Sequence, residues 1–563
     1  MTYYKRNIDK KLLEWKASQR RKPLLIRGAR QVGKSSAVRR NYIIFMVKTY
    51  ISLLLCACCQ IVSAQARTGD PLYDLLRNEM TYYYQHLSQD SVPVQFISFG
   101  ALDEKTISID SDMGCATMHE KNGRRFCPKI LFGTLNDGKG LNRFDYKEEE
   151  WMDSQMLMID LPYENDTKVI KSVIWNALSR IYRGQMAIWQ KTKKKSIQMP
   201  LVAKDYAAVH YEEPLTEVSF DKEYWKQLLN KTTAVQARKM PEAHCLAHIE
   251  GLNQRRYIID SEGTAVVSNR QSFVLAIRAS VKDFRGVEIA LDKEYFAYKT
   301  SELPDQETLA HDMEVLVQRT FALSKAPMAE AYSGPVILSG NSSAVFFHEV
   351  FGHRLERQDS EFASMRGNQV LPTDFTVTCN PQQQYLGGTP LAGYYRYDDE
   401  GSMGQKVECV KDGKMANMLT CLSQQAVTNG HGRSLFGNDP APRQSNLIVE
   451  TSHPYTETEL RKMLINELKR LKKDYGYYIK SVSNGWTTLR SSAKVASSFN
   501  IFPAETYRIY TDGRADELVR GVSLIGTPLS AFSNIKAAGG EVEVFNGRCG
   551  SGSGWIPVSS CSP

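Results

Sequence analysis

The chain has 563 residues, of which 42% are hydrophobic, and it carries a formal net charge of +9. This length and apolar content exclude a disordered chain and predict two or more domains with a large buried core. The charge is concentrated at one end, because residues 1–45 carry a net charge of +11 and residues 46–563 therefore carry −2. The main body lacks the basic balance typical of nucleic-acid binding, and we expect no nucleic-acid partner.

The first 45 residues contain a phosphate-binding motif of the form G-x-x-x-x-G-K-[ST]. Its defining residues are Gly28, Gly33, Lys34 and Ser35. In such a loop, backbone N–H groups cradle phosphates and the lysine reaches them. The segment resembles the opening of bacterial AAA-type ATPases, but the parallel sheet and the acidic strand that such a domain needs do not follow. We therefore predict that residues 1–45 are a truncated P-loop ATPase-like fragment with a vestigial nucleotide site.

Residues 46–66 have the pattern of a secretory signal peptide. A basic start at Lys48 is followed by a mostly apolar run over residues 50–62 and by small residues through Ala66. The apolar run, about 15 residues, is too short for a stable membrane span. The alternative is a buried core strand or helix. The signal-peptide interpretation predicts a periplasmic or secreted protein if translation begins at Met46, and a cytoplasmic protein if the whole chain from Met1 is made.

Residues 67–245 are predicted to form an N-terminal α/β domain. It opens with a helix from Asp70 to about Leu87, and isoleucines at positions 170, 174, 181 and 188 later mark one buried face of a long amphipathic helix. In an exported protein, Cys115 and Cys127 are candidates for a small disulfide loop.

Residues 246–563 are predicted to form a larger, mostly antiparallel β-rich domain. The pattern favours strands at residues 257–259, 265–267, 273–279, 287–291 and 335–338, and helices at residues 304–323 and 457–471. The predicted fold class is therefore α+β, with the candidate metal-site helix in the second domain.

The strongest chemical signal is the run His348-Glu349-Val350-Phe351-Gly352-His353, on a predicted helix with Asn341 or Ser342 as N-cap. In hydrolytic zinc sites, histidines bind the metal and a glutamate takes a proton from metal-bound water. Here the histidines are five apart, which places them roughly 140° apart around an ideal helix. A π-bulge would bring them to one side, and Gly352 would ease it because it lacks a Cβ. We therefore predict an irregular helix between the two histidines.

A catalytic zinc usually has three protein ligands and an open position. Cys549, in a Gly/Ser-rich segment, is the best candidate for the third ligand, and a buried or disulfide-bonded cysteine is the alternative. His244 and His248 are also spaced for a helical metal pair, but no acidic residue stands in the base position and their neighbours favour a strand. We therefore assign no metal site to that pair.

Seven motifs, in this order along the chain, resemble those of the TldD/PmbA metallopeptidases. They are Tyr332-Ser333-Gly334-Pro335-Val336, the His348 motif, Tyr397-Asp398-Asp399-Glu400-Gly401, Gly430-His431-Gly432-Arg433, Leu518-Val519-Arg520-Gly521-Val522, Gly526-Thr527-Pro528-Leu529 and Asn546-Gly547-Arg548-Cys549-Gly550. The resemblance runs from about residue 70 to the end and is to a TldD-type, metal-containing member. It implies a zinc ion held by His348, His353 and Cys549, with Glu349 as the catalytic base.

The resemblance also implies a substrate and a partner. It implies that peptides or unfolded protein segments are cut inside a closed chamber, and that the chain forms a homodimer or a heterodimer with a PmbA-like partner. Typical members are cytoplasmic, whereas residues 46–66 predict export, and further strands would be expected after Cys549.

The predicted function is a zinc-dependent metallopeptidase in which Glu349 activates a zinc-bound water. Two alternatives stay open, namely a P-loop nucleotide-binding protein that uses residues 28–35 and a non-catalytic scaffold of the same fold. His431 and Arg433 are candidates for oxyanion donors, although solvated turn residues are the simpler interpretation.

Overall fold

The computed structural model describes residues 69–89, 94–132, 142–143, 158–192, 197–198, 208–216, 219–423, 428–489 and 497–563. The P-loop fragment and the signal peptide predicted for residues 1–66 lie outside these ranges and stay predictions. Residues 69–563 form one compact unit. Within the described ranges, no helix is long and apolar enough to cross a membrane.

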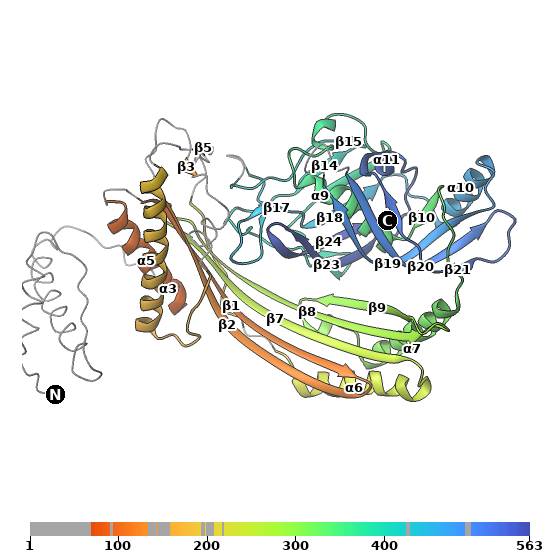
Figure 1. The fold of residues 1–563 in the computed structure, drawn as a ribbon, viewed down its shortest axis with the longest axis horizontal. Coiled ribbons are helices and arrows are strands. Elements are labelled where there is room, and N and C mark those ends of the chain that lie inside the picture. The colour runs from red at the N-terminus through yellow and green to blue at the C-terminus, as the bar shows by residue number, and fades with distance from the viewer. Residues whose placement is uncertain are drawn as a thin grey trace, which may run out of the picture. The chain divides into compact units, whose positions relative to one another are not determined.

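A seven-stranded sheet dominates the first half of this unit (Figure 1). Its path is β4-β2-β1-β7-β8-β6, and β9 pairs with β8. The strands are β1 (Val94–Asp112), β2 (Cys115–Phe132), β4 (Ile159–Asp160), β6 (His210–Glu212), β7 (His244–Asp260), β8 (Ala265–Lys282) and β9 (Glu288–Ala297). All neighbours in it are antiparallel except β6 and β8. A short ribbon, β3 (Asn142–Arg143) with β5 (Ile197–Gln198), stands apart.

Four helices cover one face of the sheet. They are α3 (Pro71–Leu87), α5 (Thr167–Thr192), α6 (Lys222–Lys239) and α7 (Gln306–Lys325). Side chains alternate across a strand, and apolar odd-numbered residues of β7 such as Ile249 and Ile259 pack under the helices. Even-numbered residues point the other way, where Glu250 pairs with Arg548 and Arg256 with Asp399. The second face of the sheet therefore meets the C-terminal half of the chain.

Two expectations about the first half need comment. The predicted domain boundary between residues 245 and 246 falls inside β7, which pairs with β1 from the N-terminal side. The predicted Cys115–Cys127 loop is wrong, because both cysteines are free and lie on one strand, β2. Twelve residues of extended chain separate them by roughly 40 Å.

The C-terminal half is built on two larger sheets. The five-stranded sheet contains β10 (Val336–Leu338), β19 (Tyr475–Thr488), β20 (Ser498–Tyr510), β21 (Glu517–Val519) and β22 (Leu524–Gly526). The six-stranded sheet runs in the order β15 (Lys414–Met415), β14 (Val407–Lys411), β11 (Phe375–Cys379), β18 (Asn446–Thr451), β24 (Gly554–Ser562) and β23 (Glu543–Ser551). Two ribbons join β12 (Tyr385–Leu386) to β13 (Thr389–Pro390) and β16 (Gly432–Arg433) to β17 (Ala441–Pro442). The predicted α+β class is confirmed.

The helices of this half are α8 (Gly340–Phe347), α9 (His353–Leu355), α10 (Glu457–Arg470) and α11 (Pro528–Ser533). A π-helical turn, His348–Gly352, joins α8 to α9. Side chains from these elements, such as Phe351, pack with Val377 of β11 and Ile501 of β20 in one apolar core. The motif helix therefore lies between the two sheets.

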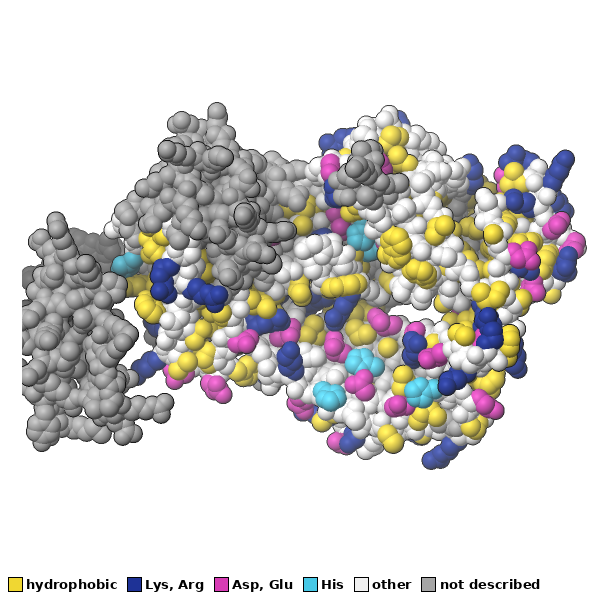
Figure 2. All heavy atoms as spheres, viewed as in Figure 1, with side chains coloured by type: hydrophobic (Ala, Val, Ile, Leu, Met, Phe, Trp, Pro, Cys, Tyr) yellow, Lys and Arg dark blue, Asp and Glu magenta, His cyan; other side chains and the backbone are white. Residues whose placement is uncertain are grey.

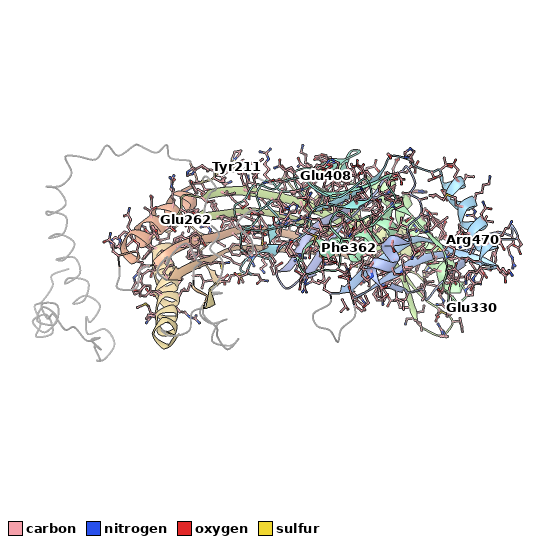
Figure 3. All side chains as sticks on the ribbon, turned by 90° about the horizontal axis from the view of Figure 1, so that it is seen from above. Tyr211, Glu262, Glu330, Phe362, Glu408 and Arg470 are labelled. Atoms are coloured by element: carbon pink, nitrogen blue, oxygen red, sulfur yellow. The ribbon has the colours of Figure 1, made fainter. Side chains whose placement is uncertain are left out.

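Side-chain views locate these parts. Glu262 is in the turn between β7 and β8, and Arg470 is at the end of α10. The two residues lie on opposite sides of the view in Figure 3. Acidic and basic side chains are interspersed on the visible face (Figure 2). This mixture agrees with the small net charge of residues 46–563.

Candidate metal centre

The motif helix begins two or three residues earlier than the sequence suggested. Ser339, directly after β10, is the N-cap of α8, and its hydroxyl accepts a hydrogen bond from the Ser342 backbone N–H. The predicted caps, Asn341 and Ser342, are therefore wrong, since both already lie in the first turn. The Asn341 N–H is bound instead by the carboxylate of Glu543 on β23.

The predicted irregularity is confirmed as a π-helical turn over His348–Gly352. Because this turn holds one more residue than an α-turn, it brings side chains five apart to the same side. Gly352 suits a close approach there, since a Cβ at this position would lie 2.0 Å from the Gln444 side-chain oxygen. Any other residue would have to push Gln444 aside.

The turn and β23 bring three metal-binding side chains together. The donor atoms of His348, His353 and Cys549 all lie within 4.8 Å of one another, and all three side chains are buried. Cys549 Sγ lies 3.4 Å from His353 Nε2. Donor atoms on one tetrahedral metal are separated by roughly 3.5 Å, given metal–nitrogen and metal–sulfur bonds near 2.0 and 2.3 Å. The spacing therefore suits a shared ion.

Glu349 stands beside this triad. Its Oε2 lies 3.9 Å from His353 Nε2, is buried, and has no hydrogen-bond partner among the described residues. Gly485 of β19 makes room for the carboxylate, because a Cβ there would lie 2.7 Å from Glu349 Cγ. A buried carboxylate oxygen without a partner is costly unless a ligand or water satisfies it.

A chain of buried polar groups supports two of the three donors. His353 Nδ1 lies 3.2 Å from Glu356 Oε2. Arg443 reaches Glu356 Oε1 at 3.3 Å and donates to Cys549 Sγ at 3.1 Å and to the Cys549 carbonyl at 2.8 Å. The backbone N–H of Gln444 also donates to Glu356. Glu356 therefore directs the other ring nitrogen of His353 toward the triad, and Arg443 holds the cysteine.

These contacts shift the pKa values of two of the donors. Burial raises the pKa of the Cys549 thiol, but the charges of His348 and His353 outweigh burial and lower it to about 6. Burial disfavours the charged form of His353, whereas Glu356 and Cys549 raise the His353 pKa well above its ordinary value. A thiolate is thereby favoured at neutral pH, which is the form that binds metals.

The other sequence candidates lie elsewhere. His244 and His248 are on β7, as their neighbours suggested, and hydrogen-bond to Asp112 and Asp110 of β1. They do not converge on a shared point with a third donor among the described residues.

His431 and Arg433 are not solvated, contrary to the simpler interpretation. His431 is fully buried, and burial lowers its pKa to about 4. The Arg433 guanidinium is buried against the ring of Tyr395 and pairs with Asp399. Neither residue hydrogen-bonds to a member of the triad.

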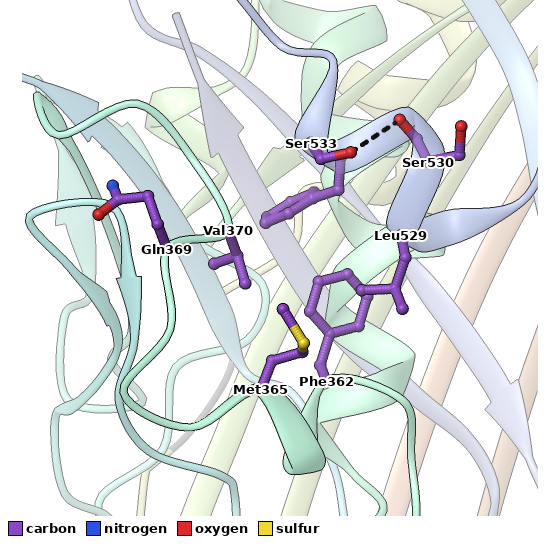
Figure 4. A pocket seen from close by; sticks show the side chains of 8 residues that line it. Phe362, Met365, Gln369, Val370, Leu529, Ser530 and Ser533 are labelled. Carbon is purple, nitrogen blue, oxygen red and sulfur yellow. Dashed lines mark hydrogen bonds between the residues drawn. The ribbon is translucent and has the colours of Figure 1, made fainter.

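An apolar pocket of about 230 Å³ lies beside the π-helical turn (Figure 4). Its walls are Phe362, Met365, Gln369, Val370, Leu529, Ser530, Phe532 and Ser533. Phe532 also stacks on Phe351 of the π-helical turn with ring centroids 4.7 Å apart. The lining has no ionisable side chain, so the pocket offers none of the donors of the metal centre.

Sequence reasoning missed Glu356, Arg443, Gln444 and Gly485. Only Glu356 carried a usable signal, since a carboxylate three residues after a histidine on a helix is within reach of its ring. The others come from segments roughly 90 to 135 residues away along the chain, and folding alone brings them to the site.

Comparisons with known proteins show what this chain is similar to. Residues 331–562 match the family described as PmbA/TldA metallopeptidase C-terminal domain. A metalloprotease of Archaeoglobus fulgidus is 29% identical over 236 residues, which cover 40% of this chain and 50% of that protein. A zinc metalloprotease TldD homolog of Saccharolobus solfataricus is 23% identical over 252 residues, which cover 44% of this chain and 53% of that protein. The chain spans about half the length of these curated relatives.

The crystal structure of TldE from Thermococcus kodakarensis resembles this chain in fold. The TM-score is 0.55 at 11% sequence identity, and the match covers 88% of this chain and 100% of that chain. Residues 331–562 thus match one family model, the two metalloproteases are similar over less than half of this chain, and the solved structure shares its fold.

Proposed function

We propose that this chain is a zinc-dependent metallopeptidase that hydrolyses peptides or unfolded protein segments. The observation that carries the proposal is the convergence of His348, His353 and Cys549 beside the unpartnered carboxylate of Glu349. Two imidazoles and a thiol suit zinc, which favours nitrogen and sulfur donors and often leaves one position open in catalytic sites. The relatives named as metalloproteases support a peptide as the substrate.

Each side chain has a distinct role in this proposal. When bound, zinc would polarise a scissile carbonyl and lower the pKa of a water ligand. Glu349 would accept the proton at its free Oε2 and return it to the leaving amine. Glu356 and Arg443 would hold His353 and Cys549 in the ligating geometry. A partner subunit of the TldE kind is supported by the fold similarity, and it would enclose the site.

The test uses the full chain with metal analysis and a panel of unfolded peptides. We expect about one zinc per chain, loss of cleavage after chelation, and recovery on adding zinc. Glu349→Gln should keep its zinc and lose activity by about 100- to 10,000-fold, the range for removing a general base. Cys549→Ser should lose zinc affinity.

The matched control is Glu330→Gln, because Glu330 is an exposed carboxylate on the surface (Figure 3). It should leave zinc content and cleavage unchanged. Full activity in Glu349→Gln would refute the assigned base. Zinc binding without cleavage of any peptide, alone or with a partner subunit, would favour the non-catalytic scaffold.

A further inference from the structure

Three arginine side chains gather around one carboxylate where the seven-stranded sheet meets the C-terminal half. Arg256 Nη1 on β7 lies 2.6 Å from Asp399 Oδ1, and Arg433 Nε on β16 lies 3.4 Å from Asp399 Oδ2. Arg270 on β8 is a diagonal neighbour of Arg256 on the same face of the sheet. Burial opposes ionisation of Asp399, but the three arginines hold its pKa below the ordinary value. Three positive charges thus share one negative charge.

Two of these guanidinium groups have N–H groups without a partner, one of them buried and the other half-buried. Arg433 is 5% exposed, and its Nη1 has no hydrogen-bond partner in the described part of the chain. Arg270 has no hydrogen bond or ion pair there either, although it is partly exposed to solvent. Burial, together with repulsion from Arg433 and Arg256, lowers the pKa of Arg270 to about 9. Unpaired buried charge is costly, and an incoming anion would relieve it.

The nearby acidic side chains do not supply this anion. Asp398 accepts hydrogen bonds from the backbone N–H groups of Gly432 and Ser402, and Glu400 accepts them from Leu422 and Ser423. Burial raises the pKa of both carboxyl groups, which disfavours their charged forms. Their hydrogen bonds hold the loop, so the positive excess around Asp399 stays uncompensated.

The arginine cluster is connected to the metal centre by one short ribbon. Arg433 on β16 is opposite Ala441 on β17, and Arg443, two residues further, donates to Cys549 Sγ. Two residues of extended chain measure roughly 7 Å. In the space-filling view, a crevice runs between the long strands and the C-terminal half, with Lys or Arg side chains along it (Figure 2). An anion held by the cluster would therefore lie a few peptide residues from the metal donors.

We propose that Arg256, Arg270 and Arg433 bind the C-terminal carboxylate of a peptide whose scissile bond lies at His348, His353 and Cys549. This inference rests on the proposed peptidase function and adds a substrate class, peptides with a free C-terminus cut near that end. Guanidinium groups suit a carboxylate because their planar N–H forks match its two oxygens. An acidic side chain offers the same chemistry, so the two carboxylate sources must be separated by experiment.

The experiment measures binding of labelled peptides to the full chain in the Glu349→Gln background, which separates binding from cleavage. Three peptides of one sequence are compared: one with a free C-terminus, one amidated, and one amidated with glutamate as the last residue. The free peptide should bind at least about tenfold more tightly than the amidated one, the effect of a charge-assisted hydrogen bond. Adding Arg270→Gln should bring this ratio close to one.

Arg278→Gln is the matched control, because Arg278 lies on the same strand and face but already pairs with Asp292 and Glu288. It should keep the full affinity ratio. If Arg270→Gln does not fold, Arg270→Lys keeps the charge without the planar fork and should show a ratio below that of the unsubstituted residue.

The outcomes separate the inference from the proposed function. Equal affinity for free and amidated peptides would overturn the carboxylate site, even if the wild-type chain cleaves both. Equal affinity for the free peptide and the amidated glutamate peptide would overturn the assignment to the C-terminus. A persistent ratio in a chain that cleaves no peptide would support the carboxylate site and overturn the peptidase function.

Discussion

Arg443→Met tests whether the buried polar chain positions the metal donors. The Arg443 side chain is 1% exposed, and its bonds reach Glu356, the thiol and the carbonyl of Cys549, and the loop at Ser553 and Gly554. Methionine fills much of the space but leaves Glu356 buried without its cationic partner. Removing one member of a buried ion pair destabilises by about 3–5 kcal/mol.

The effect on metal binding is a separate quantity. Groups that hold metal ligands typically contribute about 10–100-fold to affinity, so zinc affinity of Arg443→Met should fall by that factor. Competition with a chromophoric chelator measures this fall, and the thiolate-to-metal absorption band of the cobalt-substituted protein reports the Cys549 geometry. Arg443→Lys, which keeps the charge and part of the bonding, should recover part of the affinity.

The control is Arg461→Met, because Arg461 is partly exposed and pairs with Asp516 on the surface. Surface pairs contribute about 0–1 kcal/mol, so this variant should bind metal normally and melt close to the wild type. The positioning role would be refuted if Arg443→Met were destabilised as expected yet kept wild-type zinc affinity and an unchanged cobalt band. Arg443 would then serve the fold alone.

Two further substitutions probe the site and its surroundings. Gly485→Ala places a Cβ against the Glu349 side chain, so we expect a kcat loss of about 100-fold with unchanged zinc content, as for a base displaced by about 1 Å. Gly123→Ala is the control, because a Cβ there meets no neighbour. Normal turnover in Gly485→Ala would contradict the role of Glu349 as the base. His431 titrates at about 4 in the fold against about 6.5 in the unfolded chain, so the unfolded state binds more protons between these values and stability falls by roughly 3 kcal/mol as the pH drops through them. Between pH 7 and pH 5, the Tm of His431→Gln should therefore fall by less than the Tm of the wild type. An equal fall in both proteins would show that the His431 imidazole is not the cause.

Local sequence patterns predicted the single elements of this site, but not how distant elements come together to form it. The five-residue spacing of His348 and His353 demanded a distorted helix, because a single ion cannot bind two rings on different sides of an α-helix. The π-helical turn confirms that demand. Cys549 was a candidate because of its Gly/Ser-rich segment and was then implied by the resemblance to the family, but no spacing rule could place it on β23 beside the helix. The helix start was missed because Ser339 and the later serines share the same capping chemistry.

Non-local partners lay beyond sequence reasoning. The disulfide loop was expected because Cys115 and Cys127 are close along the chain, but a continuous strand keeps such residues apart. In the sequence, nothing distinguishes Arg443 and Gly485 from ordinary loop and strand residues. They reach the site only because the fold places β18 and β19 on either side of the motif helix. Their signal is burial and steric fit, which depend on the folded neighbours rather than on the local pattern.

The placement of Arg443 explains how the site can be held before a metal arrives. Cys549 lies on β23 of the six-stranded sheet, and Arg443 lies in the short segment that leads into β18 of the same sheet. His353 belongs to the helix, and Glu356 links that helix to Arg443. The hydrogen bonds through Glu356 and Arg443 already link His353 on the helix to Cys549 on the sheet, and an ion bound by both residues would form a second link. If the three donors bind zinc as proposed, the polar chain would preorganise them, so loss of Arg443 should weaken metal binding while every donor is kept.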